Sequence, residues 1–169
     1  LSGAGIAAAT GTLNVGGVLM SSGGVASTAT LTGTANSIVS IGSFTVTSGD
    51  FLANSTVGLG VTGPISAKNV ALSAPTLTVG GDIASSGTSA VLTAGAGGIA
   101  LNSGTLSNPV LVDLSATGGG VTQTASHVIE TATLRSSSGV VGTVALNGTA
   151  NSIASLGTFA VTTGDFILQ

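Results

Sequence analysis

The chain carries few side chains that could take part in acid–base, nucleophilic or metal chemistry. Its 169 residues include five carboxylates, two cations, one histidine and no cysteine. A glycosidase needs two carboxyl groups facing each other across a cleft, whereas neighbouring acids here are 17 (130 − 113) to 35 (165 − 130) residues apart. Without cysteine this chain has no disulfide, thiolate nucleophile or thiolate metal ligand. The ionisable side chains are Asp50, Lys68, Asp82, Asp113, His127, Glu130, Arg135 and Asp165.

His127, Glu130 and Arg135 form the densest charged cluster. Catalysis would require one of them within hydrogen-bond reach of a substrate proton. The segment HVIETATL reads as a strand in which His127 and Ile129 share one side and Glu130 takes the other. We therefore expect the cluster to lie on a solvated surface, and the remaining acids to be turn or solvent-exposed residues.

Metal, phosphate and nucleic-acid motifs are weak. Calcium-binding solenoids repeat a GGxGxD pattern, of which Gly80-Gly81-Asp82 is a single partial match. The GAGG at Gly95–Gly98 is not followed by the helix or GK[ST] of a phosphate loop. Two cations cannot form a basic patch. We expect no catalytic residue, no metal, no cofactor and no nucleic-acid partner.

An internal repeat is the clearest organisational signal. The first block, Leu31–Phe51, returns as the second block, Leu146–Phe166, at an offset of 146 − 31 = 115 residues, with 15 of 21 positions identical. A fixed-period repeat is typical of repetitive architectures. All four phenylalanines of the chain fall at matching places in the two blocks, and we expect them to be the bulkiest core residues: Phe44, Phe51, Phe159 and Phe166.

Four polar residues of the blocks have the character of turn residues. Asn36 and Asn151 occupy the same place in GTANSI, and Asp50 and Asp165 follow a glycine near the end of each block. Asn and Asp side chains bond to nearby backbone groups in turns. We expect all four to cap turns of the chain.

Composition excludes several classes of protein. Only 4% of the residues are charged and 43% are hydrophobic, with 28 glycines. Disordered chains are poorer in aliphatic residues and richer in charge. A membrane-spanning helix needs about 20 mostly apolar residues, and Gly, Ser, Thr or Asn interrupts every apolar run here. We expect an ordered protein without a membrane span.

Short apolar-x-apolar triplets recur along the chain, separated by Gly-rich turns. Examples are Leu13/Val15, Phe44/Val46 and Leu77/Val79. This period-2 alternation indicates many short strands. A sandwich or propeller would fit the strand count, but the small residues and the tolerance of duplication favour a right-handed parallel β-helix over 1–169. At roughly 20 residues per turn it would make eight or nine turns, and the 115-residue period about six.

The chain resembles the repetitive stalks of large secreted bacterial surface proteins, the filamentous-haemagglutinin-like exoproteins and related β-helical adhesins. The resemblance lies in the low charge, the lack of cysteine and pieces such as LTVGGDI, NVALSA and GTANSI. It implies a structural segment of an extracellular fibre, stalk, adhesin or biofilm matrix, cut from a longer polypeptide. Implied partners are further turns along the rod axis, by self-association or continuation, and host surfaces, environmental surfaces or polysaccharide.

Two other functions remain open from the sequence. Thr-x-Thr pairs, such as Thr45/Thr47, Thr76/Thr78 and Thr122/Thr124, would suit an ice-binding solenoid if they stacked turn over turn. Their spacing is irregular. A carbohydrate-binding or carbohydrate-degrading β-helix would need a groove rich in charged or aromatic side chains.

Overall fold

The protein is an all-β coil of stacked turns. A computed structural model describes all residues, Leu1–Gln169, and contains seventeen strands and no helix. Every strand pair is parallel, and paired residues lie one turn apart in the chain. Their offsets run from 83 − 65 = 18 for Ile65 and Ile83 to 140 − 116 = 24 for Ala116 and Val140. This pattern confirms the predicted β-solenoid and excludes a sandwich or a propeller.

Each turn of the coil visits three faces, which we name A, B and C in chain order. Face A comprises β1 (Ile6–Ala7), β3 (Ala29–Leu31), β6 (Phe51–Asn54), the first halves of β9 (Val70–Val79) and β11 (Ala90–Leu101), and the second halves of β12 (Thr105–Ala116), β14 (Val128–Val141) and β16 (Ser152–Thr162). Face B comprises β2 (Asn14–Leu19), β4 (Ser37–Ile41), β7 (Leu59–Val61), the second halves of β9 and β11, β13 (Val121–Gln123), β15 (Val144–Leu146) and β17 (Phe166–Leu168). Face C comprises β5 (Phe44–Thr45), β8 (Ile65–Ala67), β10 (Ile83–Ser85) and the first halves of β12, β14 and β16.

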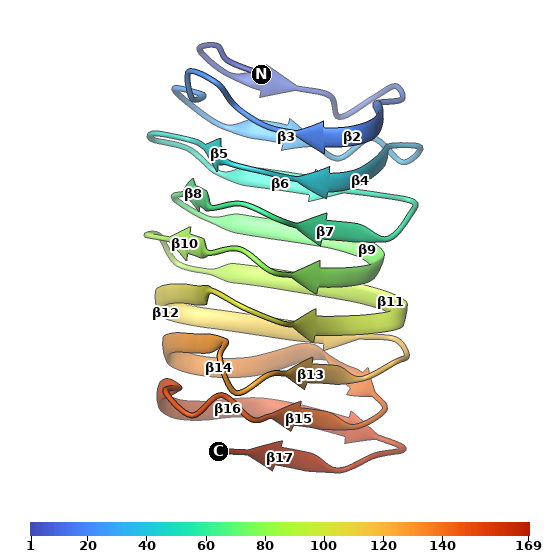
Figure 1. The fold of residues 1–169 in the computed structure, drawn as a ribbon, viewed down its shortest axis with the longest axis vertical. Coiled ribbons are helices and arrows are strands. Elements are labelled where there is room, and N and C mark those ends of the chain that lie inside the picture. Colours follow the sequence, from blue (N-terminus) through green and yellow to red (C-terminus); the bar gives the residue numbers. More distant parts are fainter.

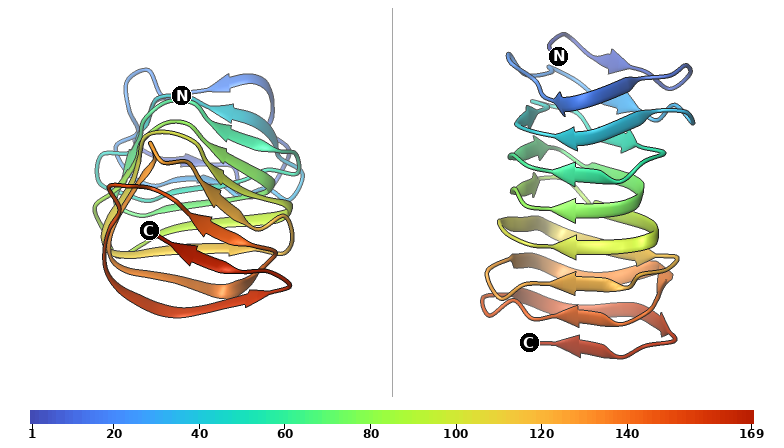
Figure 2. Two further views of the ribbon diagram at one scale, coloured as in Figure 1. Left: turned by 60° about the horizontal axis from the view of Figure 1, so that its bottom comes forward. Right: turned by 45° about the vertical axis from the view of Figure 1, so that its right-hand side comes forward.

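The coil is right-handed and its two ends lie far apart. In Figure 1 the chain descends from the N-terminus, with the nearer strands of face B running to the left and the fainter strands of face A running to the right. Figure 2 shows the turns stacked along one axis, with the termini at opposite ends. The fold is thus a short rod with two open ends.

The core is a column of aliphatic side chains inside the coil. On face C the inward residues Phe44, Ile65, Ile83, Leu106 and Ile129 pair in succession and are fully or almost fully buried. Because successive residues of a strand point to opposite sides, the apolar-x-apolar triplets place their outer members inside. Small residues at the corners let three short strands close around this narrow core.

The number of turns is lower than predicted. Offsets between 18 and 24 from one turn to the next give about seven turns rather than eight or nine, since most corners are longer than the prediction assumed. At about 4.8 Å per turn the rod is about 34 Å long.

The two blocks lie on different faces of the coil. Starting from Ala29, face A passes through Phe51, Val70, Ala90 and Val112 to Leu134, which is five turns along at an offset of 134 − 29 = 105. The repeat offset of 115 carries Ala29 past Leu134 to Val144, which lies on face B. The repeat period is therefore five turns plus one face, and the prediction of about six turns was wrong.

Candidate functional site

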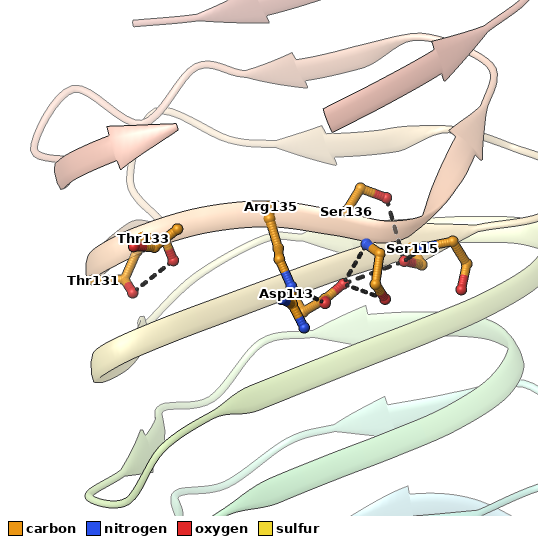
Figure 3. A network of polar contacts seen from close by, with 8 residues as sticks. Asp113, Ser115, Thr131, Thr133, Arg135 and Ser136 are labelled. Atoms are coloured by element: carbon orange, nitrogen blue, oxygen red, sulfur yellow. Dashed lines mark hydrogen bonds and ion pairs between the residues drawn. The ribbon is translucent and has the colours of Figure 1, made fainter. Parts of the chain in front are cut away.

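The largest polar cluster surrounds Asp113 on face A (Figure 3). Its Oδ2 accepts a hydrogen bond from Arg135 Nε at 2.7 Å, which is also an ion pair. Its Oδ1 accepts from the Ser137 amide at 3.0 Å, from the Ser137 hydroxyl at 3.2 Å and from the Ser115 hydroxyl at 3.3 Å. The carboxylate therefore has donors on both oxygens.

A bulge in the following turn covers Asp113. Between the pairs Asp113↔Arg135 and Ala116↔Val140 the numbering advances by 140 − 135 = 5 on β14 and by 116 − 113 = 3 on β12, so β14 holds two extra residues. Gly139 in this bulge has φ 78°, a left-handed conformation that favours glycine. The extra residues lie against the outer side of the second half of β12, where Asp113 and Ser115 are buried.

The prediction that Asp113 is exposed was wrong. Its side chain is 2% exposed, whereas that of Arg135 is 44% exposed. This nearly buried carboxylate depends on the bulge for its donors, because removing one of them would leave a buried charge unpaired. It is not placed to act on a substrate.

His127 is the second buried ionisable group. It closes the corner between faces B and C, where its amide donates to the Thr124 carbonyl at 3.2 Å. Gln123 Nε2 lies 3.3 Å from His127 Nδ1, and it also donates to the His127 carbonyl and to Asn151 Oδ1. His127 Nε2 is buried and has no hydrogen-bond partner.

The prediction that His127 lies on a solvated surface was therefore wrong, since the residue is fully buried. Burial lowers the pKa of His127 from 6.5 to about 4, and the charge of Asp82 opposes this shift. The imidazole is thus neutral at neutral pH. A neutral, enclosed ring has no route to a substrate proton.

The structure separates the three residues of the predicted charged cluster. Glu130 is exposed on face C, as the alternation predicted, whereas Arg135 lies on face A and His127 lies inside a corner. Lys68 and Asp82 are exposed at other corners, and Asp82 Oδ1 accepts from the Thr105 amide at 2.8 Å. No three His, Asp or Glu side chains come together as a metal-binding group.

Asn36 and Asn151 both lie at corners and join their own turn to the preceding one, but only Asn36 also caps its own corner, by donating from Nδ2 to the Leu31 carbonyl at 2.9 Å. Asn36 Oδ1 accepts from the Leu13 amide of the preceding turn at 2.9 Å. Asn151 Oδ1 accepts from the Ile129 amide of the preceding turn, also at 2.9 Å. The same sequence thus makes the same bond at the corner from A to B in the first block and from B to C in the second.

The two aspartates of the blocks differ. Asp50 Oδ1 accepts from Asn69 Nδ2 of the following turn at 2.7 Å, so its side chain joins two turns rather than capping its own. Asp165 is exposed in the last turn. In both cases the backbone carbonyl accepts from the preceding turn at 2.8 Å, from Ala29 and from Val144 respectively.

The four phenylalanines form two pairs, each across a corner. Phe44 and Phe51 are fully buried, with ring centroids 4.4 Å apart and nearly parallel planes at 23°. Phe159 and Phe166 are partly buried, 4.9 Å apart and tilted by 58°. The predicted core role is therefore confirmed in full for the first pair and in part for the second.

Further polar residues hold the corners of the coil. Asn69 Oδ1 accepts from the Thr88 and Ser89 amides, and Asn108 Oδ1 accepts from the Val110 and Leu111 amides. The signal for Asn108 was the Asn-Pro dipeptide, which favours turn initiation. Gln123 has no such signal, because its bonds depend on other turns.

The larger of two shallow grooves on the outer surface, of about 640 Å³, lies at the corner between faces C and A. Glu130 is the only ionisable residue among its lining, which is otherwise small, amide or apolar: Ser107, Asn108, Pro109, Glu130, Thr131, Ala132, Asn151, Ser152, Ile153 and Ala154. One carboxylate cannot supply the acid and base of glycoside hydrolysis.

Threonines do not form ranks on any face. Thr45 stacks on Ser66, and Thr78 lies between Gly60 and Ala100. Thr122 lies between Ala100 and Ala145. The register therefore gives no flat Thr array for an ice lattice.

Comparison with known proteins adds no relative from which a function could be carried over. No protein-family model matches the chain, and no curated protein or solved structure matches it. The structure also has no helix that could span a membrane.

Proposed function

We propose that this chain is a structural segment, a stiff rod within an extracellular fibre, stalk or adhesin at a bacterial surface, and that it has no catalytic role. The observation that carries the proposal is that the buried and corner polar side chains bond to other turns of the same coil. Asp113, Gln123, Asn36 and Asn151 all bond to neighbouring turns of the coil. The polar chemistry of the chain thus holds successive turns together.

The charge distribution supports an exposed, durable rod. Lys68 and Arg135 are the only Lys or Arg residues, and Arg135 lies within β14 in an ion pair with Asp113. Few sites then remain for proteases that need a cation. Backbone ladders run along all three faces, so local opening requires breaking bonds to two neighbouring turns.

Electron microscopy of the native assembly tests this function. We expect extended, unbranched rods or fibres whose width is that of a single coil. Compact particles without an extended dimension would contradict the proposal. Glycan-array binding of the purified chain, compared with a Glu130→Gln variant, would reveal a carbohydrate-binding role for the groove, which the proposal does not require.

A further inference from the structure

The C-terminal end of the coil exposes side chains that the same sequence buries elsewhere. In the first block Ile38, Ile41 and Phe44 are fully buried. Their counterparts in the second block are Ile153 and Phe159, which are only partly buried, and Leu156, which is 48% exposed. The sequence is nearly unchanged, so the difference comes from the surroundings.

The surroundings differ by one further turn. The strands β4 and β6 pair with strands on both sides, whereas β16 pairs only with β14 and β17 only with β15. The last turn therefore offers free backbone donors and acceptors next to a partly open apolar core. Such an edge is a template for another parallel strand.

The interior of the rod shows what fits on such a surface. Next to the first block, Val61 pairs with Ile41, Ile65 with Phe44, and Val70 with Phe51. These three residues come from one turn that follows directly after the block. A turn of this pattern would cover Leu156, Phe159 and Phe166 in the same way, because they are the counterparts of Ile41, Phe44 and Phe51.

The phase of the repeat allows this turn to continue the chain. Phe166 is the counterpart of Phe51, and both blocks run on as a strand, with Leu52 paired to Thr30 and Ile167 paired to Ala145. A unit with the sequence of residues 52–166, whose length equals the repeat period, could thus follow Phe166 without a change in register. It would begin on face B instead of face A.

We infer that the C-terminal end of this rod binds a further copy of the repeating unit, with the apolar pattern of residues 52–166. Each unit advances the coil by five turns and one face. Three successive units then make sixteen turns and return every side chain to its original face. The exposed corner side chains of successive units would therefore face different directions around the rod axis. This inference rests on the rod function proposed above.

A chimera tests the inference, in which residues 1–166 are joined directly to residues 52–169. We expect small-angle scattering to show a rod about 26 Å longer than the parent, from five and a third turns of about 4.8 Å. Hydrogen exchange in residues 152–166 should slow by about tenfold or more and match that of residues 37–51. The near-identical sequences of the two blocks make their intrinsic exchange rates comparable.

The control is the same chimera with Ile65→Asn and Val70→Asn in the appended unit only. It should leave residues 152–166 exchanging as fast as in the parent chain, while residues 37–51 stay protected. Fast exchange of residues 152–166 in the unmodified chimera would overturn the inference. The inference would also be overturned if, in the parent chain, protection of these residues increased with protein concentration. A second copy of the chain would then cover the end. Either result would contradict this inference and leave the proposed rod function unaffected. Compact particles in electron microscopy of the native assembly would instead contradict the rod function itself.

Discussion

The first block and the second block have nearly the same sequence and the same local structure, but they occupy different faces. Both fold as a strand, a GTAN corner, an extended segment and a Gly-Asp corner, but this segment is two strands, β4 and β5, in the first block and the single strand β16 in the second. The first block begins on face A and lies between two turns, whereas the second begins on face B and ends the rod. The corner sequences therefore encode a bend of the chain and not a particular face.

The comparison also separates two sources of stability. Both blocks share one side-chain bond to the preceding turn, from the Leu13 amide to Asn36 and from the Ile129 amide to Asn151, and the second block adds bonds to Gln123. The second block meets a following turn only through Leu146, which pairs with Leu168, and Asn151, which donates to the Gln169 carbonyl, whereas both strands β4 and β6 of the first block are covered by one. Substitutions at equivalent positions of the two blocks can therefore separate the stability that comes from the preceding turn from the stability that comes from the following turn.

The largest difference is expected for the paired phenylalanines. Phe44→Ala should lower the free energy of unfolding by about 3–5 kcal/mol, because the ring is fully buried and leaves a cavity. Phe159→Ala should cost about 1–2 kcal/mol, because that ring already contacts solvent at the rod end. Urea titration monitored by circular dichroism measures both. Equal losses would show that the end turn is covered in solution.

His127 gives a second, pH-dependent test, at a corner of the kind that Asn36 and Asn151 occupy in the blocks. Its pKa is about 4 in the folded chain and 6.5 in the unfolded chain, so the unfolded state binds more protons between these values. Stability should be full above pH 6.5 and should fall by roughly 3 kcal/mol as the pH drops from 6.5 to 4. Denaturant titration over this pH range measures the loss.

The matched variant is His127→Asn, which places at this corner the residue found in the blocks. Its unfolding free energy should lose the part of the pH dependence that lies between pH 6.5 and 4, leaving only the titration of the carboxylates. A slope identical to that of the parent would mean that His127 is not buried in the folded protein.

Much of the fold follows from local sequence. Period-2 triplets such as Leu77/Val79 and glycine-rich corners predict short strands around a narrow core, and the structure confirms both. The face on which the second block begins could not be predicted from local sequence. The offset from turn to turn varies between 18 and 24 residues, and these small differences accumulate over five turns. The duplication also extends beyond the blocks, since Ser21-Ser22 and Gly24-Val25 return as Ser136-Ser137 and Gly139-Val140.

The polar sites were harder to predict than the fold. Alternation correctly points Asp113 outward, but a bulge in the next turn covers it. Likewise, the inward position of His127 follows from Ile129, yet the amide that faces it comes from Gln123 and the adjoining cap from Asn151. Burial in a solenoid depends on the adjacent turns, which local patterns do not describe.

Glycines provide the case in which the two blocks should behave alike. A Cβ on Gly49 would lie less than 3.0 Å from backbone atoms of Ser27 and Thr28, and one on Gly164 equally close to Gly142 and Thr143. These neighbours belong to the preceding turn, which both blocks possess. Gly49→Ala and Gly164→Ala should each cost about 1–3 kcal/mol of overpacking, measured by denaturant titration. A harmless Gly164→Ala would show that the last turn is not held against its neighbour.

The smallest effect of all is expected for Asn151, one of the two corner asparagines, where site-resolved exchange is more informative than global stability. Asn36→Ala should cost about 1–3 kcal/mol, because the Leu13 amide and the buried Leu31 carbonyl both lose a partner. Asn151→Ala should cost at most about 1 kcal/mol, since Asn151 is only partly buried and Gln123, which also loses this partner, keeps its bonds to the His127 carbonyl and the Gly148 amide.

Amide hydrogen exchange by NMR distinguishes these two cases directly. Exchange at Leu13 should accelerate in Asn36→Ala and exchange at Ile129 in Asn151→Ala, with little change at the other site. If both variants accelerated exchange along the whole chain, the corners would be global determinants of folding and the local interpretation of the GTAN corner would be wrong. If only the named amides respond, each corner is an independent joint between two turns. Such independence is the property that lets one block be copied onto another face without redesign.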